Sequence, residues 1–207
     1  MAEVPDRPEP DARARRAADI RERILASAVS RVSEEGVEWL RARDVAADAG
    51  IALGSIYKHF ADFDDLVMAV NSRTLALMNE ALDAAAEGVA DPAERLERLA
   101  LAYLAFAEEQ PQRWAALFEH RMARAGSVPE WHQDDQAALF NLIDAPIATL
   151  APDMDETARA VRTRTVFGAA HGVVALALQD RFAGVPRGAL EEEIAMVARA
   201  MVAGLRA

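Results

Sequence analysis

The chain has 207 residues, of which 52% are hydrophobic, 6% aromatic and 28% charged, and its formal net charge is −11. It has no cysteine, which excludes disulfides and cysteine-ligated metal sites. No apolar run approaches the roughly 18 residues of a membrane span, and the charged, proline-rich N-terminus has no hydrophobic stretch for a signal peptide. We therefore expect a cytoplasmic protein with no membrane partner and a disordered tail over residues 1–13.

Alanine is the commonest residue and β-branched runs are few, which favours helices. Apolar residues recur at helical spacing over 14–35, where Gly36 ends the pattern, and again over 43–49, which Gly50 ends. A third short helix is expected over 53–59. Two short helices separated by a turn with glycine are typical of a helix-turn-helix motif.

Start signals and periodicity predict further helices along the rest of the chain. Their ranges are 62–88, 92–110, a helix opened by Pro111, 130–150 with a bend at Pro146, 153–182 opened by Asp153, and 189–205. With about nine helices and no convincing strand, the expected fold class is all-α.

Positive charge is concentrated near the N-terminus. Residues 13–60 hold nine basic and seven acidic side chains, about +2 together, so the rest of the chain carries about −13. Such a split indicates two modules with different partners. The only lysine, Lys58, lies in the third predicted helix.

A helical wheel of that third helix separates two faces. Leu53, Ile56 and Phe60 share one side, which we expect to be buried. The opposite side holds Gly54, Ser55, Lys58 and His59, with Tyr57 at its edge. These are small residues and hydrogen-bond donors, which suit phosphates and base edges. The alternative is the solvated polar face of an ordinary surface helix.

Residues 19–70 resemble the DNA-binding domain of TetR-type transcriptional repressors. The residues that carry the resemblance are Glu34-Glu35-Gly36, Arg43-Asp44-Val45-Ala46, Ala49-Gly50-Ile51, Gly54-Ser55-Ile56-Tyr57, His59-Phe60 and Asp65-Leu66. The resemblance implies a three-helix DNA-binding domain over 14–62 and a ligand-binding and dimerisation domain over 63–207. It also implies a homodimeric repressor that binds a near-palindromic operator and is released by a small-molecule effector.

The sequence departs from the family pattern around the expected DNA contacts. Ala52 stands where a hydroxyl residue usually caps the recognition helix, and Phe63 stands where a lysine is common. Leu53 replaces a polar residue and could meet a thymine methyl, and Arg41 could replace a threonine that reaches phosphate. The expected DNA-binding residues are Arg41, Arg43, Leu53, Gly54, Ser55, Tyr57, Lys58 and His59, with an arm formed by Arg13, Arg15 and Arg16. The alternative for the arm is a solvated tail.

The helix predicted over 153–182 has two glycines in its middle, Gly168 and Gly172. Glycine inside a helix usually has a packing reason, and the last helix also presents small and apolar residues: Ala195, Ala198, Met201, Val202 and Leu205. These two helices from each of two subunits would form a four-helix dimer interface. The alternative is close packing within one chain.

Aromatic residues of the C-terminal region could line a largely apolar effector pocket. The candidates are Trp114, Phe118, Met122, Trp131, Phe140, Phe167 and His171. The alternative is that they are plain core. The segments 114–121 and 170–172 resemble a TetR subfamily named for a Trp-His-Gly motif, although Ala170 replaces its tryptophan.

Enzyme motifs are missing from the sequence. No acidic residue stands three positions before any of the four histidines, as a di-iron carboxylate site requires. There is no His-x-x-x-His zinc pair, phosphate-binding glycine loop or nucleophile elbow. We predict no catalytic site, metal or cofactor; the alternatives are an all-α enzyme and a protein-binding scaffold without DNA binding.

Overall fold

A computed structural model of the chain describes residues 12–119, 130–178 and 184–206, and the elements below refer to those ranges. They contain nine α-helices, two short 3-10 helices and no strand, so the predicted all-α fold is confirmed. The elements are α1 (Ala12–Glu35), η1 (Val37–Trp39), α2 (Ala42–Asp48), α3 (Leu53–Ile56), α4 (Phe63–Ala86), α5 (Pro92–Glu109), α6 (Pro111–Glu119), α7 (Glu130–Leu150), α8 (Glu156–Leu178), η2 (Arg187–Ala189) and α9 (Leu190–Leu205).

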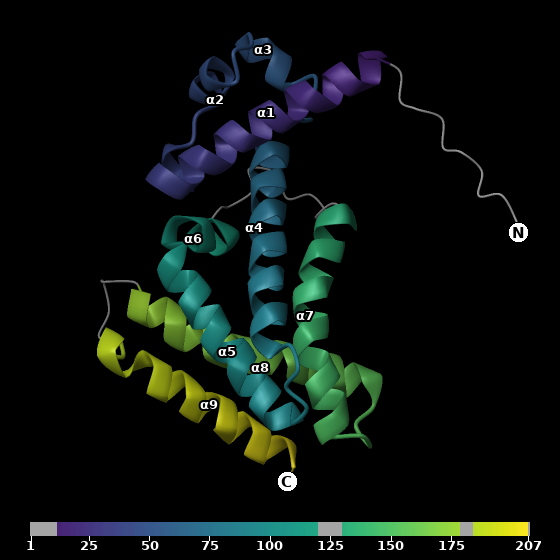
Figure 1. Cartoon of the computed structure of the whole chain (residues 1–207), viewed down its shortest axis with the longest axis vertical. Helices are drawn as coiled ribbons and strands as arrows, with labels where there is room; N and C mark the ends of the chain where they lie inside the picture. Colours follow the sequence, from purple (N-terminus) through teal and green to yellow (C-terminus); the bar gives the residue numbers. More distant parts are fainter. Residues whose placement is uncertain (1–11, 120–129, 179–183, 207) are drawn as a thin grey trace, which may run out of the picture.

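Helices α1, α2 and α3 gather at one end of the molecule, and α4 runs from them into the remaining helices (Figure 1). The core under α1–α3 contains Ile24, Val45 and Ile56, each fully buried. It continues into the first turns of α4 through Leu66 and Val70. Helix α4 therefore belongs to the core of the helix-turn-helix and, further along, to the core of the bundle.

The rest of the chain forms the helical bundle around the far half of α4. Helix α5 packs against α4, α7 and α9, and α8 packs against α7 and α9. The bundle core includes Met78 and Leu82 of α4 with Leu104 of α5 and Ile194 of α9. None of the helices in the described ranges is both long enough and apolar enough to cross a membrane.

Most helix starts follow the predicted signals. The Asp62 side chain accepts a hydrogen bond from the Asp65 backbone N–H at 2.8 Å, and Asp91 caps α5 in the same way through Ala93 at 3.1 Å. Helix α8 differs, because Asp155 rather than Asp153 accepts the capping bond, from Ala158 at 2.9 Å. Both aspartates are suitable acceptors, and sequence spacing alone does not choose between them.

The N-terminal prediction was also slightly wrong. Helix α1 begins at Ala12, so Arg13 lies in its first turn instead of in a disordered tail. The first eleven residues of that predicted tail lie outside the described ranges, as does the predicted end of α8 beyond Leu178. Helix α7 runs through Pro146 as one continuous helix.

Candidate DNA-binding surface and effector cavity

The turn between α2 and α3 is built around Gly50. Its φ is +64°, in the left-handed region that favours glycine. The Ile51 N–H bonds to the Ala46 carbonyl and the Gly50 N–H to the Ala47 carbonyl, both at 3.0 Å, which ends α2 in a Schellman motif. The guanidinium of Arg23 on α1 donates to the Ala49 carbonyl and holds this turn against the first helix.

Helix α3 is shorter than predicted. Regular α-helix covers only Leu53–Ile56, and the chain continues through residues 57–59 as tight turns. The N–H groups of Lys58 and His59 bond three residues back, to Ser55 and Ile56, at 3.2 and 2.9 Å. A step of 100° per residue therefore does not describe these positions, because such bonds wind the chain more tightly.

Burial along this segment differs from the prediction at one position. Ile56 and Phe60 are buried as predicted, but Leu53 is 45% exposed, so its expected place in the core was wrong. Tyr57 is 50% exposed, and Gly54 and Lys58 are exposed beside it. We call these four residues, Leu53, Gly54, Tyr57 and Lys58, the reading surface.

The other two predicted residues of α3, Ser55 and His59, are half-buried at the margin of the reading surface. The N-terminus of α3 has no side-chain cap, as expected from Ala52. Among the described residues, nothing lies within 4 Å of where a Cβ on Gly54 would stand, so the backbone there is open to a close approach.

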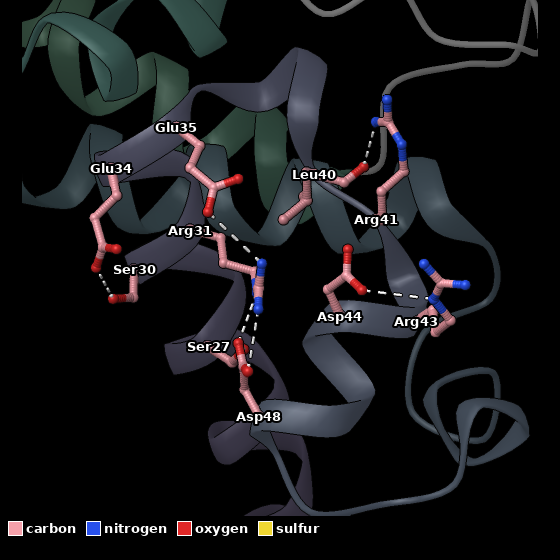
Figure 2. Close-up of polar contacts among 10 residues, drawn as sticks. All are labelled: Ser27, Ser30, Arg31, Glu34, Glu35, Leu40, Arg41, Arg43, Asp44 and Asp48. Atoms are coloured by element: carbon pink, nitrogen blue, oxygen red, sulfur yellow. Dashed lines mark hydrogen bonds and ion pairs between the residues drawn. The ribbon is translucent and has the colours of Figure 1, made fainter.

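Two arginines flank α2 at its N-terminus (Figure 2). Arg41 donates through Nη1 to the carbonyls of Glu38 and Leu40, at 2.7 and 2.9 Å, which fixes its guanidinium beside the start of the helix. The side chain of Arg43 is 85% exposed and forms a loose ion pair with Asp44 at 3.6 Å. Arg43 is therefore more available to a phosphate than Arg41.

Helices α1 and α2 are joined by an ion pair that sequence reasoning missed (Figure 2). Arg31 donates to both carboxylate oxygens of Asp48, from Nε at 2.6 Å and from Nη2 at 3.1 Å, and Ser27 donates to the same carboxylate at 3.1 Å. The hydrogen bond from Arg31 lowers the pKa of Asp48, and the same bond raises the pKa of Arg31. No sequence signal marked this pair, because its partners lie on different exposed helix faces.

The predicted basic arm is the start of α1. Arg13, Arg15 and Arg16 are exposed on its first two turns. Figure 1 shows α1 crossing the same end of the molecule that carries α2 and α3. Cations at a helix N-terminus do not complement the helix dipole, so helix stability gives no reason for them.

A cavity lies in the bundle between α4, α5, α7 and α8. Its volume is about 40 Å³. The lining residues are Leu82, Leu96, Leu99, Ala100, Tyr103, Leu139, Ile143, Val166, Phe167 and Ala170. No charged side chain is among them. Of the six predicted pocket residues that the structure describes, only Phe167 lines this cavity.

Three other predicted pocket residues, Trp114, Phe118 and His171, form an aromatic group next to the cavity. The ring centroid of His171 lies 4.2 Å from that of Phe118 and 5.5 Å from that of Trp114. Trp114 is buried, whereas Phe118 is 44% exposed. The group touches the cavity through Tyr103 and Phe167, whose ring centroids are 5.5 Å apart.

Of the remaining three predicted pocket residues, two are described, and neither lines the cavity. Phe140 packs edge-on against Phe167 at 5.6 Å, with the guanidinium of Arg164 over its ring. Trp131 is 41% exposed and contacts His132. Met122 lies outside the described residues.

Tyr103, which sequence reasoning missed, connects the cavity to the aromatic group. Trp114 Nε1 donates to the Tyr103 hydroxyl at 2.8 Å, and that hydroxyl lies 2.7 Å from His171 Nδ1. Burial raises the pKa of Tyr103 and lowers the pKa of His171, so both groups stay neutral near pH 7. The sequence holds only two tyrosines, which is the one signal that could have marked Tyr103.

Two family comparisons cover most of the chain. Residues 24–70 match the family described as bacterial regulatory proteins, tetR family, and residues 96–205 match the family described as tetracyclin repressor-like, C-terminal domain. Over 90 residues the chain is 29% identical to the HTH-type transcriptional regulator HbdR of Aromatoleum sp. (strain CIB). That alignment covers 44% of this chain and 39% of HbdR.

Solved structures share the fold. A protein with unknown function from Rhodococcus sp. RHA1 matches with a TM-score of 0.71 and 24% identity, over 91% of this chain and 96% of that one. RolR in complex with the ligand resorcinol matches with a TM-score of 0.67 and 18% identity, over 93% of this chain and 94% of RolR. The likeness to the Trp-His-Gly subfamily stays a prediction. Both matched families and HbdR are described as regulators, not as enzymes, and the chain belongs to the TetR family of transcriptional regulators.

Proposed function

We propose that this protein is a ligand-responsive repressor that binds a near-palindromic operator as a homodimer. The observation that carries the proposal is the reading surface, which combines an exposed apolar side chain, an open glycine, a tyrosine and the only lysine of the chain. A surface helix of an ordinary bundle has no reason to expose Leu53 and Tyr57 together.

Each part of the reading surface suits a different part of DNA. Leu53 offers an apolar contact for a thymine methyl, and Tyr57 and Lys58 offer donors to phosphates or base edges. Arg43 is exposed one helix away and serves as a phosphate contact, with Arg41 held in place beside it. Ser55 and His59 would contribute from the margin, and Arg13, Arg15 and Arg16 would reach the flanking backbone.

A homodimer would present two reading surfaces to successive major grooves, about 34–36 Å apart. On α8, Val161 is 62% and Leu176 is 45% exposed, and no described residue lies within 4 Å of a Cβ built on Gly168 or Gly172. Packing against the described part of the same chain therefore does not explain these glycines, whereas close approach of a second α8 would. The predicted α9 residues contribute less, because Ala195, Ala198, Val202 and Leu205 are already buried within the chain.

Replacing a glycine of α8 by a larger residue tests the proposed dimer. In a lone chain Gly172→Ala would gain helix propensity, about 1 kcal/mol, without a clash. In the proposed dimer, Gly172→Leu fills the space that the partner needs and shifts the protein toward monomer at micromolar concentration, measured by light scattering. Ala105→Leu, on an exposed position of α5, is the matched control. A wild-type monomer would refute the half-site arrangement.

Helix α4 would carry the effect of ligand binding from the cavity to the DNA-binding domain, so that the protein releases DNA. Leu82 of this helix lines the cavity, while Leu66 and Val70 of the same helix lie in the core under α1–α3. A ligand that favours one position of α4 would change the spacing of the two reading surfaces through its different affinity for the two states. The resorcinol complex of RolR supports this part of the proposal, since it shows that a protein of this fold binds a small ligand. The division at residues 14–62 and 63–207 is part of the same proposal.

Selection of bound duplexes from a random DNA pool tests the function as a whole. The expected result is enrichment of an inverted repeat whose half-sites are about one helical turn apart. A reporter gene placed downstream of the enriched site should be repressed when this protein is present. The proposal would be contradicted if no sequence were enriched and the protein bound all duplexes alike, with an affinity set by the salt concentration alone.

A further inference from the structure

Four consecutive residues of α4 interrupt its apolar contacts, and we call them the collar: Asn71, Ser72, Arg73 and Thr74. Val70, just before the collar, belongs to the core under α1–α3, and Leu75, just after it, belongs to the core of the bundle. Asn71 and Thr74 are nonetheless buried, at 6% and 0% exposure. Helix α4 is therefore polar at the point where it passes from one core to the other.

Two of the collar residues bond to α6. Asn71 Nδ2 donates to the Ala116 carbonyl at 3.2 Å. Arg113 Nε donates to Thr74 Oγ1 at 3.3 Å, and that hydroxyl donates in turn to the Val70 carbonyl at 3.1 Å. Ala116 itself is fully buried in the core under α1–α3. These bonds therefore tie α4 to a helix that also packs under α1.

The other two collar residues bond to α7 and α1. Ser72 Oγ lies 3.0 Å from Nδ1 of His132, which is buried on α7. Arg73 Nη2 donates to Glu22 Oε2 of α1 at 2.5 Å, on the exposed side of α4. Successive helical residues are about 100° apart, so four of them span about 300° of the circumference. The collar thus surrounds α4 where Figure 1 shows this helix between α6 and α7, next to α1.

Stability alone gives little reason for an asparagine at position 71. The Oδ1 atom of Asn71 is buried and has no hydrogen-bond partner among the described residues. Leaving such an acceptor unpaired costs at least as much as one net hydrogen bond returns. A hydrogen bond gives direction instead, because it weakens steeply when its angle changes, and a single buried asparagine can fix the register of packed helices. The collar is therefore suited to holding α4 at one position and one rotation.

The position of α4 decides where the reading surface points. The first turns of α4 share their core with α1–α3, so those helices follow that end of α4, whereas α8, the proposed dimer helix, belongs to the bundle. One base pair more between two half-sites shifts one of them by about 3.4 Å and turns it by about 34°. A dimer follows this displacement only if α4 bends or moves against α6 and α7. The collar bonds to these two helices oppose that movement.

We propose that Asn71, Ser72 and Thr74 are positioning residues, which hold the two reading surfaces at one separation and thereby restrict the protein to operators of one half-site spacing. This inference rests on the proposed function, because it names what sets the spacing that the dimer recognises. The three residues lie in the collar and not on the reading surface, so they contribute to selectivity for spacing and not to DNA contact.

Operators of different spacing test the proposal by fluorescence anisotropy on the full chain. The two half-sites enriched from the random pool are placed at the preferred spacing and at spacings one and two base pairs longer and shorter. A net hydrogen bond is worth about two- to tenfold in an equilibrium constant. Breaking one collar bond in each of two subunits should therefore contribute at least about fourfold to the preference of wild type for the correct spacing.

Thr74→Val and Ser72→Ala each remove a collar bond. Both variants should bind the offset operators more tightly than wild type does, so that the ratio of affinities between preferred and offset spacing falls at least about fourfold. Affinity for the preferred spacing and its salt slope should stay near wild type, because no phosphate contact is lost. Thr149→Val on α7 is the matched control, since it also removes a hydroxyl that donates to a carbonyl four residues back, and it should keep the wild-type ratio.

Asn71→Leu separates positioning from folding. It removes the unpaired Oδ1 together with the bond to Ala116, so Tm should not fall, while the preference for one spacing should weaken as in the other two variants. This variant keeps the test valid if Thr74→Val folds poorly.

Three results would overturn the inference: a wild type that binds all spacings alike, collar variants that keep the wild-type ratio, or variants that bind every spacing more weakly by the same factor. The last result is what a purely structural role predicts, because a smaller folded fraction affects all operators equally. If wild type binds none of the duplexes, the proposed function is wrong and this inference falls with it. If the duplexes bind and only the ratio is unchanged, the proposed function stands and the positioning role is wrong.

Discussion

Replacing Ala52 by serine should restore the cap that α3 lacks. The backbone of Ala52 is already extended, with φ −68° and ψ 144°, as an N-cap residue requires, yet no side chain accepts from the first N–H groups of the helix. The same chain shows the capped arrangement at Asp62, whose side chain accepts from Asp65 at 2.8 Å. A serine hydroxyl at position 52 would accept from the N–H of Gly54, because the N–H of Ser55 already bonds to the carbonyl of residue 52 at 2.8 Å.

The expected gain is about 1 kcal/mol, within a range of roughly 0.5–2 kcal/mol for such caps. For a protein of this length, about 1 kcal/mol corresponds to a rise of roughly 2–4 °C in Tm. The exposed position of Ala52 means that no core repacking competes with this gain.

Thermal unfolding followed by circular dichroism, at one fixed protein concentration, measures the effect. Ala47→Ser is the matched control, since Ala47 is exposed in the last turn of α2, where serine lowers helix propensity by about 0.5 kcal/mol. Opposite shifts of Tm are expected for the two variants. Were Ala52→Ser to lower Tm as the control does, residue 52 would not be the uncapped start of a helix.

Three further predictions concern the same domain. Ile56→Ala should destabilise the protein by about 2–5 kcal/mol in urea unfolding, because Ile56 is fully buried. Leu53→Ala should change stability by less than about 0.5 kcal/mol and weaken operator binding, because Leu53 is exposed. Comparable destabilisation by the two variants would contradict the burial of Ile56 and the exposure of Leu53. Asp48→Asn should remove a pH dependence: the pKa of Asp48 is lowered from 3.8 by Arg31, so its contribution to stability is complete above pH 3.8 and is lost as the pH falls through the lowered value. Wild type should therefore lose more of its urea midpoint than Asp48→Asn between about pH 6 and pH 3, and parallel profiles would show that the pair does not stabilise the fold. Arg43→Ala should weaken operator binding more than Arg41→Ala, since the guanidinium of Arg41 is held by two carbonyls, and the reverse order in a fluorescence anisotropy titration would be inconsistent with this geometry.

Much of the helix order could be predicted because local signals agree with the fold. Gly36 and Gly50 end α1 and α2 as expected, and both have positive φ. Asp62 and Asp91 cap the helices that they were predicted to start. These devices act over a few residues, so the sequence carries them directly.

Predictions failed where the packing between helices decides which residues are buried or paired. Leu53 stands in the first turn of α3 and is exposed, although the wheel placed it on the same side as the buried Ile56 and Phe60. The pairing of Arg31 with Asp48 spans two helices, and its partners look like ordinary solvated charges in the sequence.

The cavity was hardest to predict from the sequence. Leu82, Leu99 and Ile143 line it, yet helical spacing marks them only as apolar positions that a packed core would equally need. The pocket residues predicted from the sequence were mainly large aromatic ones, and most of them fill space beside the cavity. Whether an apolar residue meets a neighbour or a void depends on how four helices pack, which no local pattern records.

The salt dependence of operator binding in Lys58→Ala tests the central claim most directly. Each phosphate contact contributes a slope of about −0.9 to log Kobs against log salt concentration, so loss of one contact in each of two subunits should make the slope shallower by about 1.8. Arg187→Ala, which removes an exposed cation from η2, is the control and should leave the slope unchanged. A Lys58→Ala protein that keeps the wild-type affinity and slope would contradict the assignment of α3 as the DNA-reading element.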